Sequence, residues 1–222
     1  MPMWNNIPTF VINTDDDIGN KRLPLIQSEL KKYNIDFKLV EAIKNENGAK
    51  GLSLTMKKLF DSCIENSESD ILVFEDDAVF INDNVNEIME AAMQQLPKNY
   101  LYLSLGYNLL LPPIRESENL IKLQSSYATH AIIYSRKCIE LILDKWNEEK
   151  PYDIFLMNNI QIYGASYGVY PMLCNQRTGI SNIFEYNPEE QIGIEKYYNV
   201  ETKEINWGAM MQERYDELTK NI

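Results

Sequence analysis

Three adjacent carboxylic acids follow an apolar run in the first half of the chain. Glu75, Asp76 and Asp77 come directly after residues 71–74, a continuous apolar run of the kind that forms a strand buried on both faces of a parallel sheet. Because like charges repel and burial penalises ionisation, an acidic trio in this place needs a compensating partner. Two carboxylates can share a hard divalent cation, and Mg²⁺ or Mn²⁺ bound in this way completes its shell with water and substrate phosphate.

The end of such a strand is also where open α/β sheets bind ligands. Side chains alternate along a strand, so we expect Glu75 and Asp77 on one side and Asp76 on the other. The alternative is that Asp76 and Asp77 end the strand in a solvated turn. The nine glycines form neither a Walker A sequence nor a Gly-x-Gly-x-x-Gly fingerprint, so a bound phosphate would be held by metal instead of by a glycine loop.

The pattern of apolar residues predicts the elements that position this trio. Strands are expected over residues 8–13, 36–43, 70–74, 100–106, 128–135 and 168–174, and helices over residues 21–33, 52–65, 85–96, 136–150 and 209–220. Turn or loop chemistry is expected at residues 14–20, 44–51 and 107–119. Strand and helix alternate in the first half and the second half is mixed, which predicts an α/β sheet with a largely parallel N-terminal part.

The amino-acid composition limits the kinds of partner that the protein can bind. The 222 residues include 33 Asp and Glu against 21 Lys and Arg, a net charge of -12, which argues against a nucleic-acid partner or an anionic membrane surface. Most of this charge is interpreted as solvated surface. Three isolated cysteines give neither a disulfide framework nor a zinc site, and we find no transmembrane segment. We therefore expect one soluble, cytoplasmic domain.

Several segments then occur in a recognisable order. They are residues 10–15 with Arg22, residues 37–43, residues 72–78 with the three acids, residues 128–135, residues 151–153, residues 170–171, residues 176–177 and residues 181–183. Their order and spacing over residues 8–183 resemble glycosyltransferase family 25, the lipopolysaccharide-type glycosyltransferases related to collagen galactosyltransferases. The Glu75-Asp76-Asp77 run is similar to the Glu-Asp-Asp motif of that family.

The resemblance implies a fold and an activity. The fold would be α/β of GT-A type, with a Rossmann-like, mostly parallel central sheet flanked by helices and a mixed C-terminal half. Residues 1–222 would form a single domain, in which residues 8–106 bind a nucleotide sugar, residues 107–183 form the acceptor side and residues 184–222 form a C-terminal extension. The activity would be transfer of a sugar, which we expect to be a hexose, from a UDP-sugar donor to a hydroxyl of a glycan or other acceptor, with inversion and with Mn²⁺ or Mg²⁺. Lipopolysaccharide biosynthesis is the expected setting.

The resemblance also implies roles for particular residues. The metal would be bound by Glu75, Asp77 and His130. The donor would be contacted by Asn13, Asp15, Arg22, Glu75, Asp76 and Arg177. Inversion needs a base to take the acceptor proton, and our candidate is Asp153.

Each of these roles has a plainer alternative. Asp153 could instead cap a helix, and His130 could be a satisfied core residue. Asp15 could lie in a solvated turn, and Arg22 and Arg177 could face solvent.

Two other functions stay open. Residues 51–56 lack the Ser-His that the family often carries on the following helix, so a GT-A-like binding domain without catalysis is one alternative. A metal-dependent nucleotide hydrolase using the same carboxylates is the other.

Overall fold

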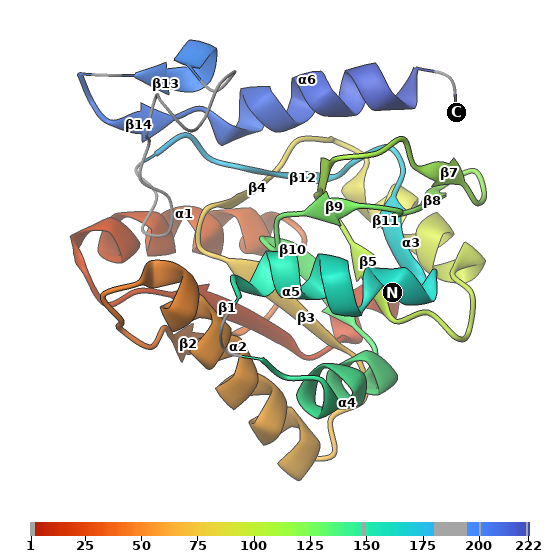
Figure 1. Ribbon diagram of the computed structural model, residues 1–222, viewed down its shortest axis with the longest axis horizontal. Helices are drawn as coiled ribbons and strands as arrows, with labels where there is room; N and C mark the ends of the chain where they lie inside the picture. Colours follow the sequence, from red (N-terminus) through yellow and green to blue (C-terminus); the bar gives the residue numbers. More distant parts are fainter. Residues whose placement is uncertain (1–2, 148–149, 180–194, 200, 221) are drawn as a thin grey trace.

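The structure is a computed structural model that describes residues 3–147, 150–179, 195–199, 201–220 and 222. A central sheet runs through the molecule, with helices on both sides (Figure 1). Its eight strands lie in the order β2-β1-β3-β10-β5-β11-β8-β7. Their bounds are β1 Thr9–Asn13, β2 Lys38–Glu41, β3 Ile71–Glu75, β5 Tyr102–Ser104, β7 Ile114–Arg115, β8 Leu120–Lys122, β10 Ala131–Tyr134 and β11 Ser166–Val169.

The strand directions confirm a mostly parallel sheet. Strands β2, β1 and β3 are mutually parallel, and β5 is parallel to β11. Strand β10 is antiparallel to both β3 and β5, and β8 is antiparallel to both β11 and β7. Six of the eight strands therefore point one way, and the predicted α/β fold class with a central sheet flanked by helices is confirmed.

Three two-stranded sheets accompany the central sheet in the described residues. They pair β4 (Ala78–Phe80) with β12 (Cys174–Gln176), β6 (Asn108–Leu109) with β9 (Ser126–Tyr127), and β13 (Tyr198–Asn199) with β14 (Glu204–Ile205). The predicted loop over residues 107–119 therefore contains two short strands, β6 and β7. The single strand predicted over residues 168–174 is two strands, β11 and β12, which belong to different sheets.

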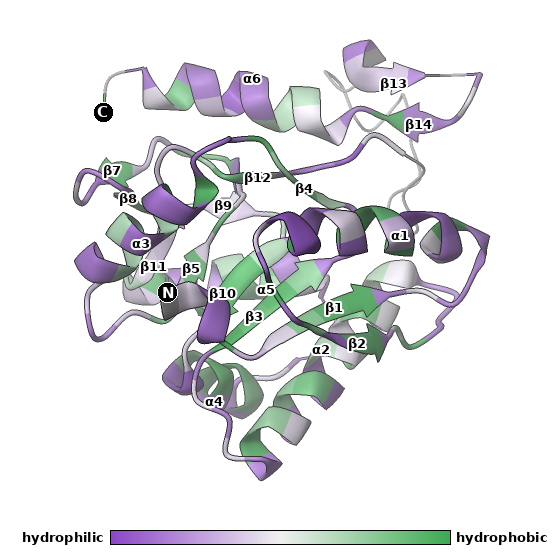
Figure 2. Ribbon diagram, turned by 180° about the vertical axis from the view of Figure 1, so that it is seen from behind, coloured by the Kyte–Doolittle hydropathy of each residue, from purple (hydrophilic) through white to green (hydrophobic). Residues whose placement is uncertain are grey.

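Helices pack on both faces because the strand side chains alternate. On β3, Ile71 and Val73 belong to one buried cluster and Leu72 and Phe74 to the other. The first cluster includes residues of α2 (Gly48–Glu65), α4 (Arg136–Asp144) and α5 (Tyr152–Asn159), and the second includes residues of α1 (Asp17–Lys32) and α3 (Val85–Gln95). Figure 2 shows the hydrophobic colour on central strands such as β1 and β3. Each large buried side chain contributes about 1.5–3 kcal/mol.

Three helix boundaries differ from the sequence prediction by four residues or more. Helix α2 begins at Gly48, within the loop predicted over residues 44–51. The turn expected over residues 14–20 ends early because α1 begins at Asp17. The carboxylate of the preceding residue, Asp16, accepts hydrogen bonds from the backbone N–H groups of Ile18 and Gly19 at 3.0 and 2.8 Å. An acidic N-cap of this kind satisfies donors that the first helical turn leaves open. The helix expected over residues 136–150 ends at Asp144.

The last described helix, α6 (Trp207–Thr219), lies along one side of the molecule, over β12 and β9 (Figure 1). The sequence places it at residues 209–220, in close agreement. The resemblance segment 181–183 and residues 184–194 of the predicted extension lie outside the described residues. None of the helices that the structure describes is both long and apolar enough to cross a bilayer.

Candidate functional site

A cavity of about 600 Å³ lies where β1, β2 and β3 end, with walls from several distant parts of the chain. This volume is typical of small-molecule sites. One wall comes from the end of β1 and from α1, a second from residues 42–45 and the start of α2, and a third from the acidic trio. The rest comes from residues 127–129, the start of α5, Gln176 and the first turns of α6. The position agrees with the rule that open α/β sheets bind ligands beyond the carboxyl ends of their strands.

All three acids of the trio line the cavity. Strand β3 ends at Glu75, and Asp76 and Asp77 form a turn before β4 begins at Ala78. The turn is needed because the chain leaves the central sheet and β4 pairs with β12. Strict side-chain alternation therefore stops at Glu75, and the expectation that Asp76 points away from the other two acids is wrong.

Asp76 is held by two residues predicted from the sequence. Its carboxylate accepts hydrogen bonds from Nδ2 of Asn13 at 2.8 Å and from the guanidinium of Arg22 at 3.1 Å. Asn13 also donates to the carbonyl of Gly19 at 2.9 Å, which joins the end of β1 to the first turn of α1. Burial raises the pKa of Asp76, and the charge of Arg22 opposes that rise. Asp76 is therefore a structural partner of Asn13 and Arg22 at the cavity wall.

Glu75 and Asp77 are less fully compensated. Glu75 accepts a hydrogen bond from the hydroxyl of Thr129 at 2.6 Å, and burial followed by the charge of Asp77 raises its pKa to about 8. Asp77 lies 3.8 Å from Arg22 and 3.4 Å from Nε2 of Gln176. Burial raises the pKa of Asp77 to about 6.

These two acids fit a hard divalent cation. Oδ1 of Asp77 is buried and has no hydrogen-bond partner among the residues that the structure describes. Burial disfavours the anionic form of both carboxyl groups, and one oxygen of Asp77 makes no hydrogen bond to the described residues. Such a pair of carboxylates is a suitable set of ligands for Mg²⁺ or Mn²⁺. Within the described part of the chain no group of three or more His, Cys, Asp and Glu side chains has the arrangement of a metal site. Glu75 and Asp77 would thus bind a metal whose other ligands are water or phosphate.

Asp153, the candidate base, also lines the cavity. It lies in the first turn of α5, whose N-cap is Pro151, so the alternative that Asp153 is the cap is wrong. Its carboxylate accepts the backbone N–H of Ile154 at 2.8 Å. Burial raises the pKa of Asp153 above the ordinary value, and hydrogen bonds from the backbone, including that of Ala128, oppose the rise. A carboxylate with a raised pKa accepts a proton more readily than an exposed one.

The structure does not bring His130 into the cavity lining with Glu75 and Asp77. Its backbone carbonyl accepts the N–H of Glu75 at 2.9 Å, but its side chain is fully buried against Gly106, where an added Cβ would collide with the ring. Burial lowers the pKa of His130 to about 4. The side chain is therefore a neutral group in the core, but neither ring nitrogen has a hydrogen-bond partner among the described residues, so the alternative of a satisfied core residue is confirmed only in its burial.

Two further predicted donor contacts also lie outside the cavity lining. Asp15 is exposed and forms an ion pair with Lys44 at 3.8 Å. The guanidinium of Arg177 pairs with Glu29 of α1 at 3.1 Å. Of the predicted site residues, the cavity thus unites Asn13, Arg22, Glu75, Asp76, Asp77 and Asp153.

Several lining residues were not predicted. They are Asp16, Lys44, Asn45, Tyr127, Thr129, Gln176, Trp207 and Met210. Thr129 falls in the segment 128–135 that the resemblance singled out, so its hydroxyl could have been considered beside His130. Trp207 follows Asn206, whose side chain accepts the backbone N–H of Ala209 at 3.0 Å. That N-cap signal marks the helix start but says nothing about which cavity the helix covers.

Comparisons with known proteins give only distant similarities. No family model matches the chain, and no curated protein matches it. Three solved structures to which it is similar are a protein from STIV, a glycosyltransferase involved in the glycosylation of the major capsid of PBCV-1, and a Drosophila β1,4-galactosyltransferase 7 in complex with manganese, UDP-Gal and xylobiose.

The first is 14% identical, covers 79% of this chain and 90% of its own, and has a TM-score of 0.49. The second is 12% identical, with 95% and 99% covered and a TM-score of 0.47. The third is 12% identical, with 83% and 73% covered and a TM-score of 0.41. At such low identities and TM-scores, these similarities assign neither a family nor an activity to this chain.

Proposed function

We propose that this chain is a metal-dependent glycosyltransferase, which moves a sugar from a UDP-sugar donor to an acceptor hydroxyl with inversion. We expect the sugar to be a hexose. The observation that carries the proposal is the acidic turn after β3, which lines a cavity of about 600 Å³. In this turn, one carboxylate oxygen of Asp77 is buried and has no hydrogen-bond partner in the described part of the chain. The lipopolysaccharide setting, the cytoplasmic location and the GT-A type stay predictions of the family 25 resemblance.

The donor side is the part of the cavity beside β1, β2 and β3. Departure of UDP from a sugar develops negative charge on the diphosphate, and a bound divalent cation would supply charge stabilisation there. Glu75 and Asp77 are the residues that would hold it. Arg22, 3.1 Å from Asp76 and 3.8 Å from Asp77, limits the repulsion within the trio.

Asp153 is proposed as the base. In the transfer step a lone pair of the acceptor oxygen forms a bond to the anomeric carbon, the bond from that carbon to the diphosphate oxygen breaks, and the acceptor proton passes to the Asp153 carboxylate. The charge of Asp153 is one of the causes that raise the pKa of Glu75, so the two carboxylates repel each other when both are ionised. A proton accepted by Asp153 relieves that repulsion.

The first test is ligand-induced thermal stabilisation. We expect UDP with Mn²⁺ to raise the melting temperature, by an amount that corresponds to about 2.7 kcal/mol when the ligand is present at 100 times its Kd. Asp77→Ala should abolish this increase, because it removes the carboxylate with the open oxygen. Asp61→Ala, an exposed acid on α2 that pairs with Lys57, is the matched control and should keep it.

The comparison uses the ligand-induced increase within each variant, so a change in the intrinsic stability of Asp77→Ala does not affect the result. Absence of an increase with any nucleoside diphosphate in the unaltered protein would contradict the proposal. Release of UDP from a panel of UDP-sugars then tests turnover. Release of inorganic phosphate alone would favour the hydrolase, and binding without any product would favour the non-catalytic domain.

A further inference from the structure

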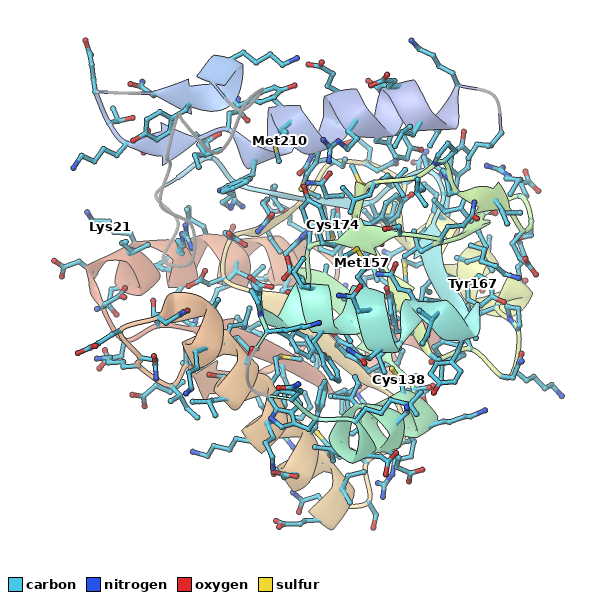
Figure 3. The ribbon with its side chains drawn as sticks, viewed as in Figure 1. Lys21, Cys138, Met157, Tyr167, Cys174 and Met210 are labelled. Atoms are coloured by element: carbon cyan, nitrogen blue, oxygen red, sulfur yellow. The ribbon has the colours of Figure 1, made fainter. Side chains whose placement is uncertain are left out.

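One wall of the cavity has a chemical character unlike the acidic turn. Tyr127 of β9 and Trp207 of α6 are both half-buried, and Met210 one turn further along α6 is buried. Figure 3 shows Met210 on the side of α6 that faces the rest of the chain. Two aromatic rings and a thioether therefore contribute an apolar surface to a cavity that otherwise has many charged groups. Nothing in the donor chemistry described above uses this surface.

The first turn of α6 is tied to the acidic turn through β12. Nδ2 of Asn175 donates to the carbonyl of Gly208 at 3.0 Å. The next residue, Gln176, pairs with Ala78 in the β12–β4 sheet and lies 3.4 Å from Asp77. A Cβ at Gly208 would come within 3.1 Å of the Gln176 carbonyl, so the helix start lies very close to β12. Trp207 is therefore placed relative to Asp77 by a short series of backbone and side-chain contacts.

Tyr127 lies on β9, which pairs with β6. It lies opposite Asn108 in the β6–β9 register, and its hydroxyl accepts a hydrogen bond from Arg214 of α6 at 3.3 Å. Helix α6 also packs against β6. The two aromatic residues thus belong to one framework, in which α6 supplies Trp207 and also holds Tyr127.

The charges of the cavity restrict what could bind there. Its lining includes five carboxyl side chains and two basic ones, which are Asp16, Glu75, Asp76, Asp77 and Asp153 against Arg22 and Lys44. The donor diphosphate would be compensated by the cation, but a second anionic ligand would still meet more carboxyl than basic side chains. Nucleic acid carries a phosphate on every residue and needs Lys or Arg to neutralise it. An uncharged ligand is therefore favoured at the aromatic wall.

We propose that Trp207 and Tyr127 form a saccharide-binding subsite, so that the acceptor is an uncharged sugar residue. This inference rests on the proposed function. A pyranose ring presents a flat face of C–H groups and a rim of hydroxyls, which suits an aromatic surface next to carboxylate acceptors. Asp153 lines the same cavity, and it would accept the proton of the hydroxyl that reacts.

The test measures saccharide binding directly. A panel of neutral monosaccharides and disaccharides built from glucose, galactose, mannose, xylose and N-acetylglucosamine is titrated against the protein with UDP and Mn²⁺ present, and binding is followed by saturation-transfer NMR. We expect at least one saccharide to bind, and Trp207→Ala to weaken its Kd about tenfold, which is about 1.4 kcal/mol. Tyr127→Ala should bind more weakly, and Tyr127→Phe, which keeps the ring but loses the hydrogen bond from Arg214, should bind more tightly than Tyr127→Ala.

Trp146→Phe is the matched control, because Trp146 does not line the cavity; its ring makes tilted contacts with Phe155 and with the lining residue Tyr152, and phenylalanine keeps an aromatic ring there. It should leave saccharide binding unchanged. Melting curves for all variants exclude a loss of binding through unfolding. The inference is overturned if no saccharide of the panel binds, or if Trp207→Ala binds it as well as the unaltered protein does.

Donor use is measured separately, as UDP released into water without an acceptor. If UDP is released but only a peptide or an oligonucleotide serves as acceptor, the proposed function stands and the saccharide subsite fails. If a saccharide binds through Trp207 but no UDP-sugar is ever consumed, the subsite stands and the proposed function fails. The two ideas can therefore be rejected independently.

Discussion

The acidic turn after β3 and the first turn of α6 line one cavity but are stabilised in opposite ways. In the acidic turn, Asp76 and Asp77 are nearly buried, and their partners are charged or strongly polar groups. At the start of α6, Trp207 is half-buried, and the helix is held by neutral hydrogen bonds, one donated by Asn175 and one accepted by Asn206.

The difference follows from the cost of burying charge. Burying a carboxylate without a partner costs free energy, so each acid in the turn needs contacts from several elements. An aromatic ring at a cavity needs only van der Waals contact with its neighbours. We therefore expect substitutions in the acidic turn to affect stability strongly. Substitutions on α6 should affect ligand binding more than stability.

The largest effect is expected for Arg22→Met. It removes the cation that pairs with Asp76 at 3.1 Å and with Asp77 at 3.8 Å while it keeps much of the side-chain volume. Loss of one partner from a buried ion pair costs about 3–5 kcal/mol, because the remaining charge is left uncompensated. We expect the free energy of unfolding to fall by about 3 kcal/mol, since Arg22 retains some exposure, as measured by urea denaturation at neutral pH.

Lys57→Met is the control for this substitution. Lys57 pairs with Asp61 at 2.7 Å on the surface of α2, where both side chains are more than a third exposed, and such pairs contribute below about 1 kcal/mol. Adding Asp76→Asn to Arg22→Met should recover part of the lost stability, because it removes the uncompensated charge. Equal effects of Arg22→Met and Lys57→Met would show that the acidic turn is not specially dependent on charge compensation.

A smaller effect is expected at Thr129. Its hydroxyl donates a hydrogen bond to Glu75 at 2.6 Å, although the two residues are 54 positions apart in the sequence. Thr129→Val removes the hydroxyl without changing the shape, so the Glu75 carboxylate loses the hydrogen bond that this side chain donates. A buried acceptor left unsatisfied costs about 1–3 kcal/mol. Thr129→Ser keeps the hydroxyl and should retain most of the stability. If the serine variant is as unstable as the valine variant, the threonine methyl group matters more than the hydrogen bond.

The sequence predicts the acidic turn better than the rest of the cavity, and the reason is physical. A continuous apolar run followed by acids is a local signal, and it correctly predicts β3, at whose end Glu75 and Asp77 line the cavity. The partners of those acids are set by sheet order, which no local pattern contains. Strand β10 lies between β3 and β5 and runs antiparallel to both, and this insertion is what brings Thr129 to Glu75.

Other differences have similar causes. The strand expected over residues 36–43 is shorter in the structure, where β2 is an edge strand of residues Lys38–Glu41 whose Leu39 is 52% exposed. The placement of His130 could not be predicted because its side chain depends on Gly106 and Cys174, which reach it through other strands. Trp207 lies more than 100 residues from most of the cavity lining, so only the tertiary structure joins them.

The smallest effect is expected from the N-caps of α1 and α6, two of the helices that border the cavity. Asp16 caps α1 with a carboxylate and Asn206 caps α6 with a neutral amide. Loss of either cap costs about 1 kcal/mol, so Asp16→Ala and Asn206→Ala should destabilise the protein equally at neutral pH. Their responses to acid should differ, because only Asp16 titrates.

The direction of that difference follows from the pKa of Asp16. The backbone N–H of Gly19 is the main cause that holds it below the ordinary value of 3.8, and Thr14 and Ile18 contribute as well. A depressed pKa means that the folded state favours the anion, so the contribution of Asp16 is complete above 3.8 and is lost as the pH falls through the folded-state pKa.

The cost of Asp16→Ala should therefore shrink on acidification while the cost of Asn206→Ala stays constant, as followed by urea denaturation over a pH series. A constant cost for both would mean that Asp16 caps α1 through its shape and not its charge, and the contrast between a charged and a neutral side of the cavity would then not extend to the helix starts.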